Sequence, residues 1–509
     1  MLKSILVLVF IVFAGFFLWG EPRLVTVLFT NDSHGMAWAF DEPGNPGVGG
    51  IAARKTLVDR IRNEVMLRNG DMILLSSGNI TMGDPRSNVC ENLPMILGMN
   101  LTGYDGMLIG SHEFDFGMRT FDKMNREARF PFMSANLFRK GQSRSIGVPT
   151  ITKELINGVK IGVVGITTPE LERITAVGAD GLVNVRDPFQ TAKPLVSKMR
   201  EENDIVIVLS NLGFSHDSRS GDVELAEKVE GIDLIIGGRT KIHLEEPVKV
   251  GNTHIVQTEG LGKWVGRFDF FLNDDNEIQK TEFRMYSVNG KRRVVRDGKE
   301  EYENIDRFLA PNEAVVRMID DLNCEVSMQV VGELVETLPG ERTLLRNEES
   351  SLGKIVTEIT RERTGTHIAF INAGSLRQGL NKGFINEMDI FSVFPFEDTI
   401  VKGNITGREL IDVFNYMAEQ QIGEGGYLQF SGISLDIVDG TVLNLKINGE
   451  PVSEDKVYSF CANSFLAGGG DGYKMFNNIN GVKDTGHTVP QVIVEYIKRE
   501  KILGPFSKK

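Results

Sequence analysis

Short apolar runs recur along the first part of the chain and alternate with stretches of helical periodicity. Runs rich in Val and Ile include RLVTVLFT (23–30), MILLSSG (72–78) and DIVIVLSN (204–211). Strands that are apolar on both faces are typical of a sheet that is buried on both sides. Between the first two runs, IAARKTLVDRIRNEV (51–65) has the spacing of a covering helix. Residues 21–302 are therefore predicted to form an α/β domain whose sheets are covered by helices on each side.

The pattern changes twice in the second half. Residues 303–337 contain PNEAVVRMIDDLNCEVSMQVVGELVE, an acidic stretch with helical periodicity that predicts a connecting helix or linker. Beyond it, residues 338–509 alternate helical stretches such as ESSLGKIVTEITRERTG with strand-like runs such as HIAFINAG. This order predicts a smaller α+β domain at the end of the chain. A chain of 509 residues is also too long for one core, which agrees with two domains.

Residues 1–20 read MLK followed by SILVLVFIVFAGFFLW, a positive charge ahead of an uncharged apolar run. This order is typical of a secretory signal peptide. Leu18 stands where a small residue normally precedes the cleavage site, so an uncleaved N-terminal anchor stays open. We expect an exported protein, periplasmic or extracellular, that contacts a membrane only if this segment is retained.

Composition limits the partners. The formal net charge of −13 repels nucleic acid, so no nucleic-acid partner is expected, and an anionic small molecule needs a local basic pocket. The three cysteines, Cys90, Cys324 and Cys461, are too few for a cysteine-based zinc cluster and are odd in number. We expect each to be a small buried hydrophobic residue rather than part of a disulfide framework.

Polar side chains follow the predicted strands of the first domain at the points where the strands end. Carboxyl ends of neighbouring parallel strands meet at one edge of a sheet, so these side chains are expected to share one crevice. Those that the pattern singles out are Asp32, His34, Asn79, Ser111, His112, Asn211 and Arg239.

Two of these motifs resemble the 5′-nucleotidase and UDP-sugar hydrolase family. TNDSHG (30–35) resembles its first metal motif, and GSHEFD (110–115) resembles its Gly-Asn-His-Glu-Phe-Asp motif. The resemblance implies a calcineurin-like metallophosphoesterase domain in which two metal ions clamp a phosphoryl group and activate water. It further implies that Asp32 and His34 are metal ligands, that His112 contacts the phosphate and that Asp115 orients His112.

The other ligand positions depart from the family pattern. Asn79, a neutral amide, stands in place of the bridging aspartate, and Ser111 stands in place of a ligand asparagine. Asn211, Arg239 and Lys241 stand in place of three nitrogen or amide ligands. A positive charge about 4 Å from a divalent ion costs roughly 8 kcal/mol at an effective dielectric of about 20, which two metals cannot tolerate here.

These departures predict that Asp32 and His34 are remnants of a metal site. We expect the side chain of Arg239 or Lys241 to lie against Asp32 where a metal would be bound. A displaced single-metal site built from nearby loop residues stays open as an alternative. The residues that could build it are His216, Asp217 and His243.

The segments that resemble the family's substrate-binding motifs depart less from the family pattern than the metal motifs do. FINAGSLRQGL (370–380), GGYLQFSGI (425–433) and NSFLAGGGDGY (463–473) resemble the substrate-binding segments of the family. They imply that guanidinium groups hold the phosphate, that two aromatic rings stack on the base, and that a carboxylate accepts from the ribose. The residues carried over are Arg346, Asn372, Arg377, Tyr427, Phe465 and Asp471.

Three functions are compatible with altered metal motifs and retained substrate-binding motifs. The first is an exported protein that binds nucleotides or nucleosides with weak or no hydrolysis. The second is an active phosphohydrolase of nucleotide catabolism, releasing phosphate from nucleoside 5′-monophosphates or related phosphoesters with a divalent metal such as Mn, Zn or Mg. The third is a scaffold with an empty pocket. No cofactor is expected for the first, and the sequence leaves the oligomeric state open.

Overall fold

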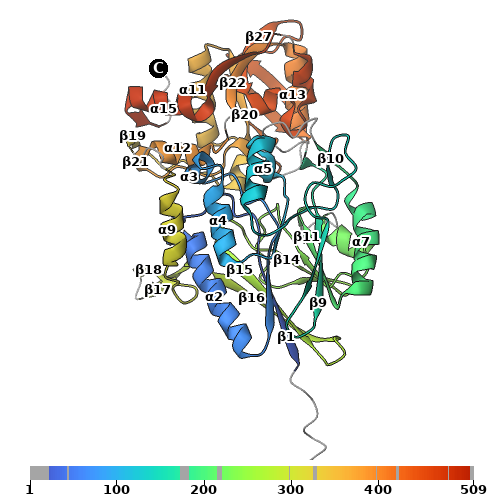
Figure 1. Ribbon diagram of the computed structural model, residues 1–509. Coiled ribbons are helices and arrows are strands. Elements are labelled where there is room, and N and C mark those ends of the chain that lie inside the picture. Colours follow the sequence, from blue (N-terminus) through green and yellow to red (C-terminus); the bar gives the residue numbers. More distant parts are fainter. Residues whose placement is uncertain are drawn as a thin grey trace, which may run out of the picture.

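The computed structural model describes most of the chain (Figure 1). The described residues are 22–42, 45–171, 183–214, 221–296, 299–324, 329–396, 398–419, 423–438, 440–479 and 481–504. The apolar N-terminal segment, 1–20, lies outside them. None of the described helices is long and apolar enough to cross a membrane.

The first part of the chain contains two six-stranded sheets. In the first, β1, β4, β5 and β6 run parallel, β15 pairs antiparallel with β1 on its other side, and β16 forms the edge beyond β15. Its strands, in spatial order, are β16 (Ile278–Ser287), β15 (Trp264–Leu272), β1 (Arg23–Thr30), β4 (Asp71–Ser76), β5 (Gly106–Leu108) and β6 (Phe132–Met133). The second sheet, in spatial order, comprises β13 (Val248–Val250), β14 (Thr253–Val256), β12 (Leu234–Ile236), β11 (Ile205–Ser210), β9 (Lys160–Ile166) and β8 (Thr150–Glu154).

These sheets pack face to face, and their inner faces share one apolar core. Val27 and Phe29 of the first sheet belong to the same cluster as Val163 and Ile207 of the second. Helices cover the outer faces (Figure 1): α2 (Ile51–Leu67), α4 (Leu93–Thr102), α5 (Gly117–Glu127) and α9 (Glu313–Asp321) over the first sheet, α7 (Pro188–Glu202) and α8 (Asp222–Lys228) over the second. The predicted α/β class is confirmed. The expectation of helices on both faces of one sheet is wrong, because a strand that is apolar on both faces can equally pack against a second sheet.

The C-terminal part is a separate α+β unit, as predicted. Its five-stranded sheet has the order β23 (Leu428–Ser431), β20 (Ile368–Asn372), β27 (Val457–Asn463), β22 (Thr399–Thr406) and β28 (Lys483–Thr488). Helices α11 (Ser351–Thr364) and α15 (Val489–Glu500) pack on one face, and α13 (Gly407–Ala418) and α14 (Ser464–Ala467) on the other.

The predicted connecting helix is shorter than its periodicity indicated. Helix α9 ends at Asp321, and VVGEL forms strand β19 (Val330–Leu334), which pairs with β21 (Gly383–Asn386) and β29 (Ile502–Leu503). Val315 and Ile319 of α9 pack into the core of the first domain. The domain limits at 302 and 338 stay predictions.

Smaller elements complete the chain. They are β2 (Ala39–Glu42), β3 (Asn45–Gly49), α3 (Pro85–Val89), η1 (His112–Phe114), β7 (Leu137–Arg139), β10 (Val183–Val185), β17 (Lys291–Arg296), β18 (Lys299–Asn304), α10 (Arg342–Leu345), η2 (Ala373–Ser375), α12 (Glu387–Val393), β24 (Ile433–Val438), β25 (Thr441–Ile447), β26 (Glu450–Pro451), η3 (Gly470–Gly472) and η4 (Lys474–Asn478).

Cys90 and Cys324 form a disulfide between the end of α3 and the segment after α9, with a Cα to Cα distance of 5.6 Å. The expectation that these two are isolated buried hydrophobic residues is therefore wrong. They lie 234 residues apart, so neither spacing nor parity indicated the pair. Cys461 is free and buried, as expected.

Candidate active site

The residues that follow β1, β4 and β5 meet at one edge of the first sheet. The backbone N–H of Asp32 donates to the carbonyl of Gly78 at 2.9 Å, and that of His34 donates to the carbonyl of Asn79 at 3.0 Å. The side-chain oxygen of Asn79 in turn accepts from the backbone N–H of His112 at 3.1 Å. The loops after these parallel strands are thus joined to one another, as the positions of the strand ends predicted.

The Asp32 carboxylate lies at the centre of this edge and is fully buried. The side-chain amides of Asn31 and Asn79 each donate to it at 2.8 Å. The backbone N–H of Arg239 donates to both oxygens, at 3.1 and 2.8 Å. A carboxylate offers about four acceptor sites, so these four contacts fill them.

His34 and His112 lie beside each other, with ring centroids 5.0 Å apart. The Nδ1 atom of His34 faces the carbonyl oxygen of Met82 at 3.1 Å, and its buried Nε2 has no hydrogen-bond partner among the described residues. Burial, with the nearby charges of Lys241 and other cations, holds the pKa of His34 well below its usual range, so His34 is neutral. Because a carbonyl only accepts, Nδ1 carries the proton and Nε2 presents a lone pair.

His112 and Asp115 form the pair that the resemblance implied. The Nδ1 atom of His112 lies 2.5 Å from the Asp115 carboxylate, within one turn. Ser111, buried beside them, has its hydroxyl 3.5 Å from the Asn79 side-chain oxygen. Asp115 therefore fixes the orientation of the His112 ring at the rim of the site.

The two cations at positions that the resemblance assigns to metal ligands, Arg239 and Lys241, behave differently. The guanidinium of Arg239 turns away from Asp32, donating to the carbonyl of Leu212 at 2.9 Å and pairing with Glu170. Lys241 is half-buried, and Asp32 is the carboxylate whose charge acts on it most strongly. Burial and the charge of Arg377 lower the pKa of Lys241 to about 7. The expectation that a cation lies against Asp32 is thus wrong for the Arg239 side chain. For Lys241, the charge of Asp32 acts on the ammonium group without an ion pair, and its place at a former metal position stays a prediction.

The donor set does not fit a pair of divalent metal ions. The four acceptor sites of Asp32 are taken, and the Asn79 side chain turns its NH₂ group toward Asp32. Lys241 adds a positive charge near Asp32, at a position where the sequence resemblance implied a neutral ligand. The chemistry of these residues therefore does not support a two-metal hydrolysis step.

Of the three residues considered for a displaced metal site, the structure describes only His243. His243 packs edge-on against Trp264, with ring centroids 4.6 Å apart. His216 and Asp217 lie outside the described residues. Asn211, at the end of β11, is fully buried, and neither atom of its side-chain amide has a partner among the described residues.

Arginines of the C-terminal part face the strand-end residues. Arg377, after η2, feels the charge of Asp115 and packs on the ring of Phe396 at 4.8 Å. Arg346, the C-cap of α10, donates to the carbonyl of Gly423 at 3.0 Å. Burial lowers the pKa of Arg377 to about 10 and that of Arg346 to about 9.

Arg342 is a further cation at the site that was not predicted from the sequence. It lies one helical turn before Arg346, donates to the carbonyl of Thr240 at 3.4 Å, and feels the charge of Asp32. The spacing of four residues in ERTLLRN was a usable signal, because residues i and i+4 share one face of a helix. These contacts bring α10 of the second part against the Arg239 loop of the first.

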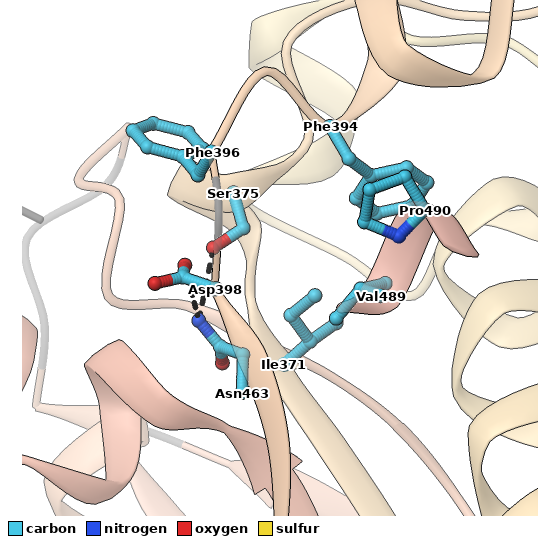
Figure 2. A pocket seen from close by; sticks show the side chains of 8 residues that line it. All are labelled: Ile371, Ser375, Phe394, Phe396, Asp398, Asn463, Val489 and Pro490. Carbon is cyan, nitrogen blue, oxygen red and sulfur yellow. Dashed lines mark hydrogen bonds between the residues drawn. The ribbon is translucent and has the colours of Figure 1, made fainter. Parts of the chain in front are cut away.

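A buried polar network supports the C-terminal pocket. The side-chain amide of Asn372 donates to Asp471 at 2.7 Å, and its oxygen accepts from Ser375 at 2.6 Å and from Asn463 at 3.1 Å. Asn463 also donates to Asp398 at 3.1 Å, and Figure 2 shows this contact beside the apolar wall of a small cavity. Asp398 and Asn463 thereby hold Asn372, and Asn372 holds Asp471. Nothing in the sequence near Asp398 indicated this role.

The two aromatic residues predicted to stack on a base are half-buried. Tyr427 packs against both apolar clusters of the C-terminal part. The ring of Phe465 lies on the backbone of Gly470, where any Cβ atom would be 2.6 Å from the ring. A side chain at position 470 would therefore displace the ring from its present position, and stacking on a ligand stays a prediction.

A two-sheet α/β sandwich whose strand ends face the arginines of an α+β unit defines a two-domain, metallophosphoesterase-like protein. Residues 330–478 match the family model described as 5′-nucleotidase, C-terminal domain. A 5′-nucleotidase of Vibrio vulnificus (strain CMCP6) is 31% identical over 93% of this chain and 90% of its own length. Protein UshA of Escherichia coli (strain K12) is 31% identical over 94% of this chain and 92% of its own. The chain belongs to the 5′-nucleotidase family.

Solved structures agree on the fold. The 5′-nucleotidase precursor from Thermus thermophilus superposes with a TM-score of 0.81 at 24% identity, covering 95% of this chain and 98% of that one. The sulfate thiohydrolase SoxB of the same organism gives a TM-score of 0.76 at 18% identity, covering 95% of each chain. The large metallophosphoesterase-like domain followed by a smaller C-terminal 5′-nucleotidase domain, expected from the sequence, is confirmed.

Proposed function

We propose that this chain binds a nucleotide between its two parts, with weak or no hydrolysis. The observation that carries the proposal is that the charges of Lys241 and Arg377 act on each other, while Asp32 acts on the first and Asp115 on the second, so that cations from both parts of the chain lie near one another. A phosphate group suits these cations, since guanidinium and ammonium groups are its usual partners in proteins. We expect the ribose and base to extend toward Asp471 and Phe465, because the charge of Asp471 acts on Arg377 and Arg346.

A titration calorimetry experiment tests this function. We expect saturable binding of adenosine and tighter binding of AMP, and we expect Phe465→Ala to weaken both by about 5- to 150-fold, the equivalent of about 1–3 kcal/mol of stacking. Phe384→Ala is the matched control, because Phe384 is 79% exposed and lies outside the site. Absence of saturable binding for both ligands would leave only the scaffold function.

A second candidate is a phosphohydrolase acting on nucleoside 5′-monophosphates or related phosphoesters. It is supported by the names of the relatives, which are 5′-nucleotidases, and this support favours turnover over binding alone. The His112 and Asp115 pair is also in place at the site. Phosphate release from AMP with added Mn²⁺, compared with the same assay in a chelator, distinguishes the two candidates. Turnover that is lost in chelator and in His112→Ala would establish the hydrolase.

We further propose that the protein is exported. The apolar segment at residues 5–18 supports this, and so does the Cys90–Cys324 disulfide, since such bonds persist in oxidising compartments. Fractionation of the source cells with an antibody to the chain tests the location. Recovery of the protein with reduced cysteines in the cytosolic fraction would contradict it.

A further inference from the structure

Lys241 is a cation that the described structure leaves without an ionic partner. Among the described residues, no carboxylate lies within ion-pair distance of its ammonium group, although Asp32 acts on it through space. Arg239, by contrast, is neutralised by Glu170. A charge that is half-buried without a partner is costly, so its retention needs a reason beyond packing.

The surroundings of Lys241 make that cost larger. Arg377, Arg342 and Arg346 all repel its charge, and they come from the opposite part of the chain. Like charges gathered in a partly desolvated site are stabilised by an anion that enters between them. The carboxylates of Asp115, Asp471 and Glu424 act on these arginines, but among the described residues none of them pairs with Lys241.

Asp32 cannot supply this group on its own. Its four acceptor sites are filled by Asn31, Asn79 and the backbone of Arg239, which keeps its carboxylate turned into the loops. The unpartnered Nε2 of His34 lies 3.8 Å from Asp32 and offers a lone pair at the same place. A phosphate monoester, with two charges and several oxygens, suits a site of several cations that donate to its oxygens. The His34 lone pair accepts only from a phosphate oxygen that carries a proton.

We propose that Lys241 takes the place of a metal ion, so that this chain binds the phosphate group of its ligand without metal. The inference rests on the proposed nucleotide binding and adds how the phosphate is held. The Lys241 ammonium and the guanidinium groups of Arg377 and Arg342 surround the phosphate oxygens. Asn79 and the Arg239 backbone keep Asp32 from competing for the ammonium.

The test uses the purified full chain in a chelating buffer, with inorganic phosphate, AMP and adenosine as separate probes in titration calorimetry. We expect phosphate and AMP to bind in chelator with affinities that added Mn²⁺ changes less than twofold. Lys241→Met should weaken AMP and phosphate at least tenfold and leave adenosine unchanged, while Lys241→Arg should keep most of the AMP affinity. Lys402→Met is the matched control, since Lys402 is an exposed lysine on β22 outside the site.

Misfolding does not imitate this result. Removal of a poorly solvated charge should leave the melting temperature of Lys241→Met unchanged or raise it. Adenosine binding with AMP no tighter than adenosine in chelator would overturn the inference and leave nucleoside binding intact. AMP binding that requires Mn²⁺ would also overturn it. Failure of adenosine and AMP together, with phosphate still bound in chelator, would instead contradict the proposed nucleotide pocket and support the Lys241 site.

Discussion

Asp398 is a carboxyl group that the fold buries next to neutral donors. Burial raises its pKa to about 6, only partly offset by the hydrogen bond from Asn463, and the charges of Asp115 and Asp471 raise it further. The unfolded value is near 3.8, so the folded state binds the proton more tightly between these two pH values. Ionisation of Asp398 therefore lowers stability as the pH rises from about 4 to about 6, by at most about 3 kcal/mol.

The Asp398→Asn variant tests whether ionisation of this one carboxyl group lowers stability. The asparagine oxygen can still accept from Asn463, but it does not ionise. We expect the melting temperatures of variant and native protein to agree best near pH 4, and the variant to be the more stable above about pH 6. Glu113 and Asp222, whose pKa values burial raises to about 7, titrate in both proteins and cancel in the comparison. Parallel melting-temperature curves for the two proteins over this range would contradict a raised pKa for Asp398.

Backbone conformation explains why the residues around Asp32 could be located from the sequence while the directions of their side chains could not. Asp32, Asn79, Arg239 and Lys241 all have φ between 49° and 75°, in the left-handed region. That conformation costs roughly 1–2 kcal/mol for a side chain other than glycine, so the loops are held by their surroundings. Sequence order predicted that these loops converge. It could not predict which side chain turns toward Asp32, because Arg239 finds Glu170, a residue 69 positions away.

At the scale of elements, the disulfide links two helices that border the seam, the contact between the first part of the chain and the C-terminal part. Cys90 caps α3, which packs against α12 of the C-terminal part, and Cys324 follows α9, which packs on α2 and α4. Asn88 of α3 also donates to the carbonyl of Pro395 at 3.3 Å. The bond therefore fastens the connecting segment next to the place where the two parts meet.

Loss of this bond should lower stability without removing the fold. A disulfide that closes a long loop restricts the unfolded chain, and its removal typically costs about 2–5 kcal/mol. We expect the urea midpoint of the native protein to fall on addition of dithiothreitol, and the Cys90→Ser, Cys324→Ser double variant to match the reduced protein. The double variant should not respond to the reductant, and a response would assign the effect to the buried Cys461 instead.

The element order was predictable and the layering was not. Each apolar run marked a strand, and helix α2 lies where its periodicity placed it. Residues such as Val163 and Ile207 are apolar whichever layer covers them, so the sandwich of two sheets could be seen only in three dimensions. In the connecting segment, helical periodicity continued past Asp321 although strand pairing with β21 and β29 determines the structure of Val330–Leu334. Tertiary pairing there overrides local pattern.

Across the whole molecule, two electrostatic fields act on an anionic ligand in opposite directions. The net charge of −13 repels it from everywhere on a molecule whose radius of gyration is about 23 Å. Lys241, Arg342, Arg346 and Arg377 attract it, and they gather at one position in the seam. Distance determines which of the two fields is stronger at the ligand. A Coulomb energy falls with separation, and the dispersed negative charges lie mostly farther from the ligand than a Debye length.

The salt dependence of binding shows which field is stronger. A change from about 0.01 M to about 0.1 M salt shortens the Debye length from about 30 Å to about 10 Å. If the local cations dominate, the Kd for AMP should rise about 3- to 10-fold over this change, because salt competes for the same cations. Adenosine, which carries no charge, should change little, and Lys241→Met should have a shallower slope for AMP. An AMP affinity that increases with salt would mean instead that the acidic surface controls binding and that the cations of the seam are neutralised within the protein.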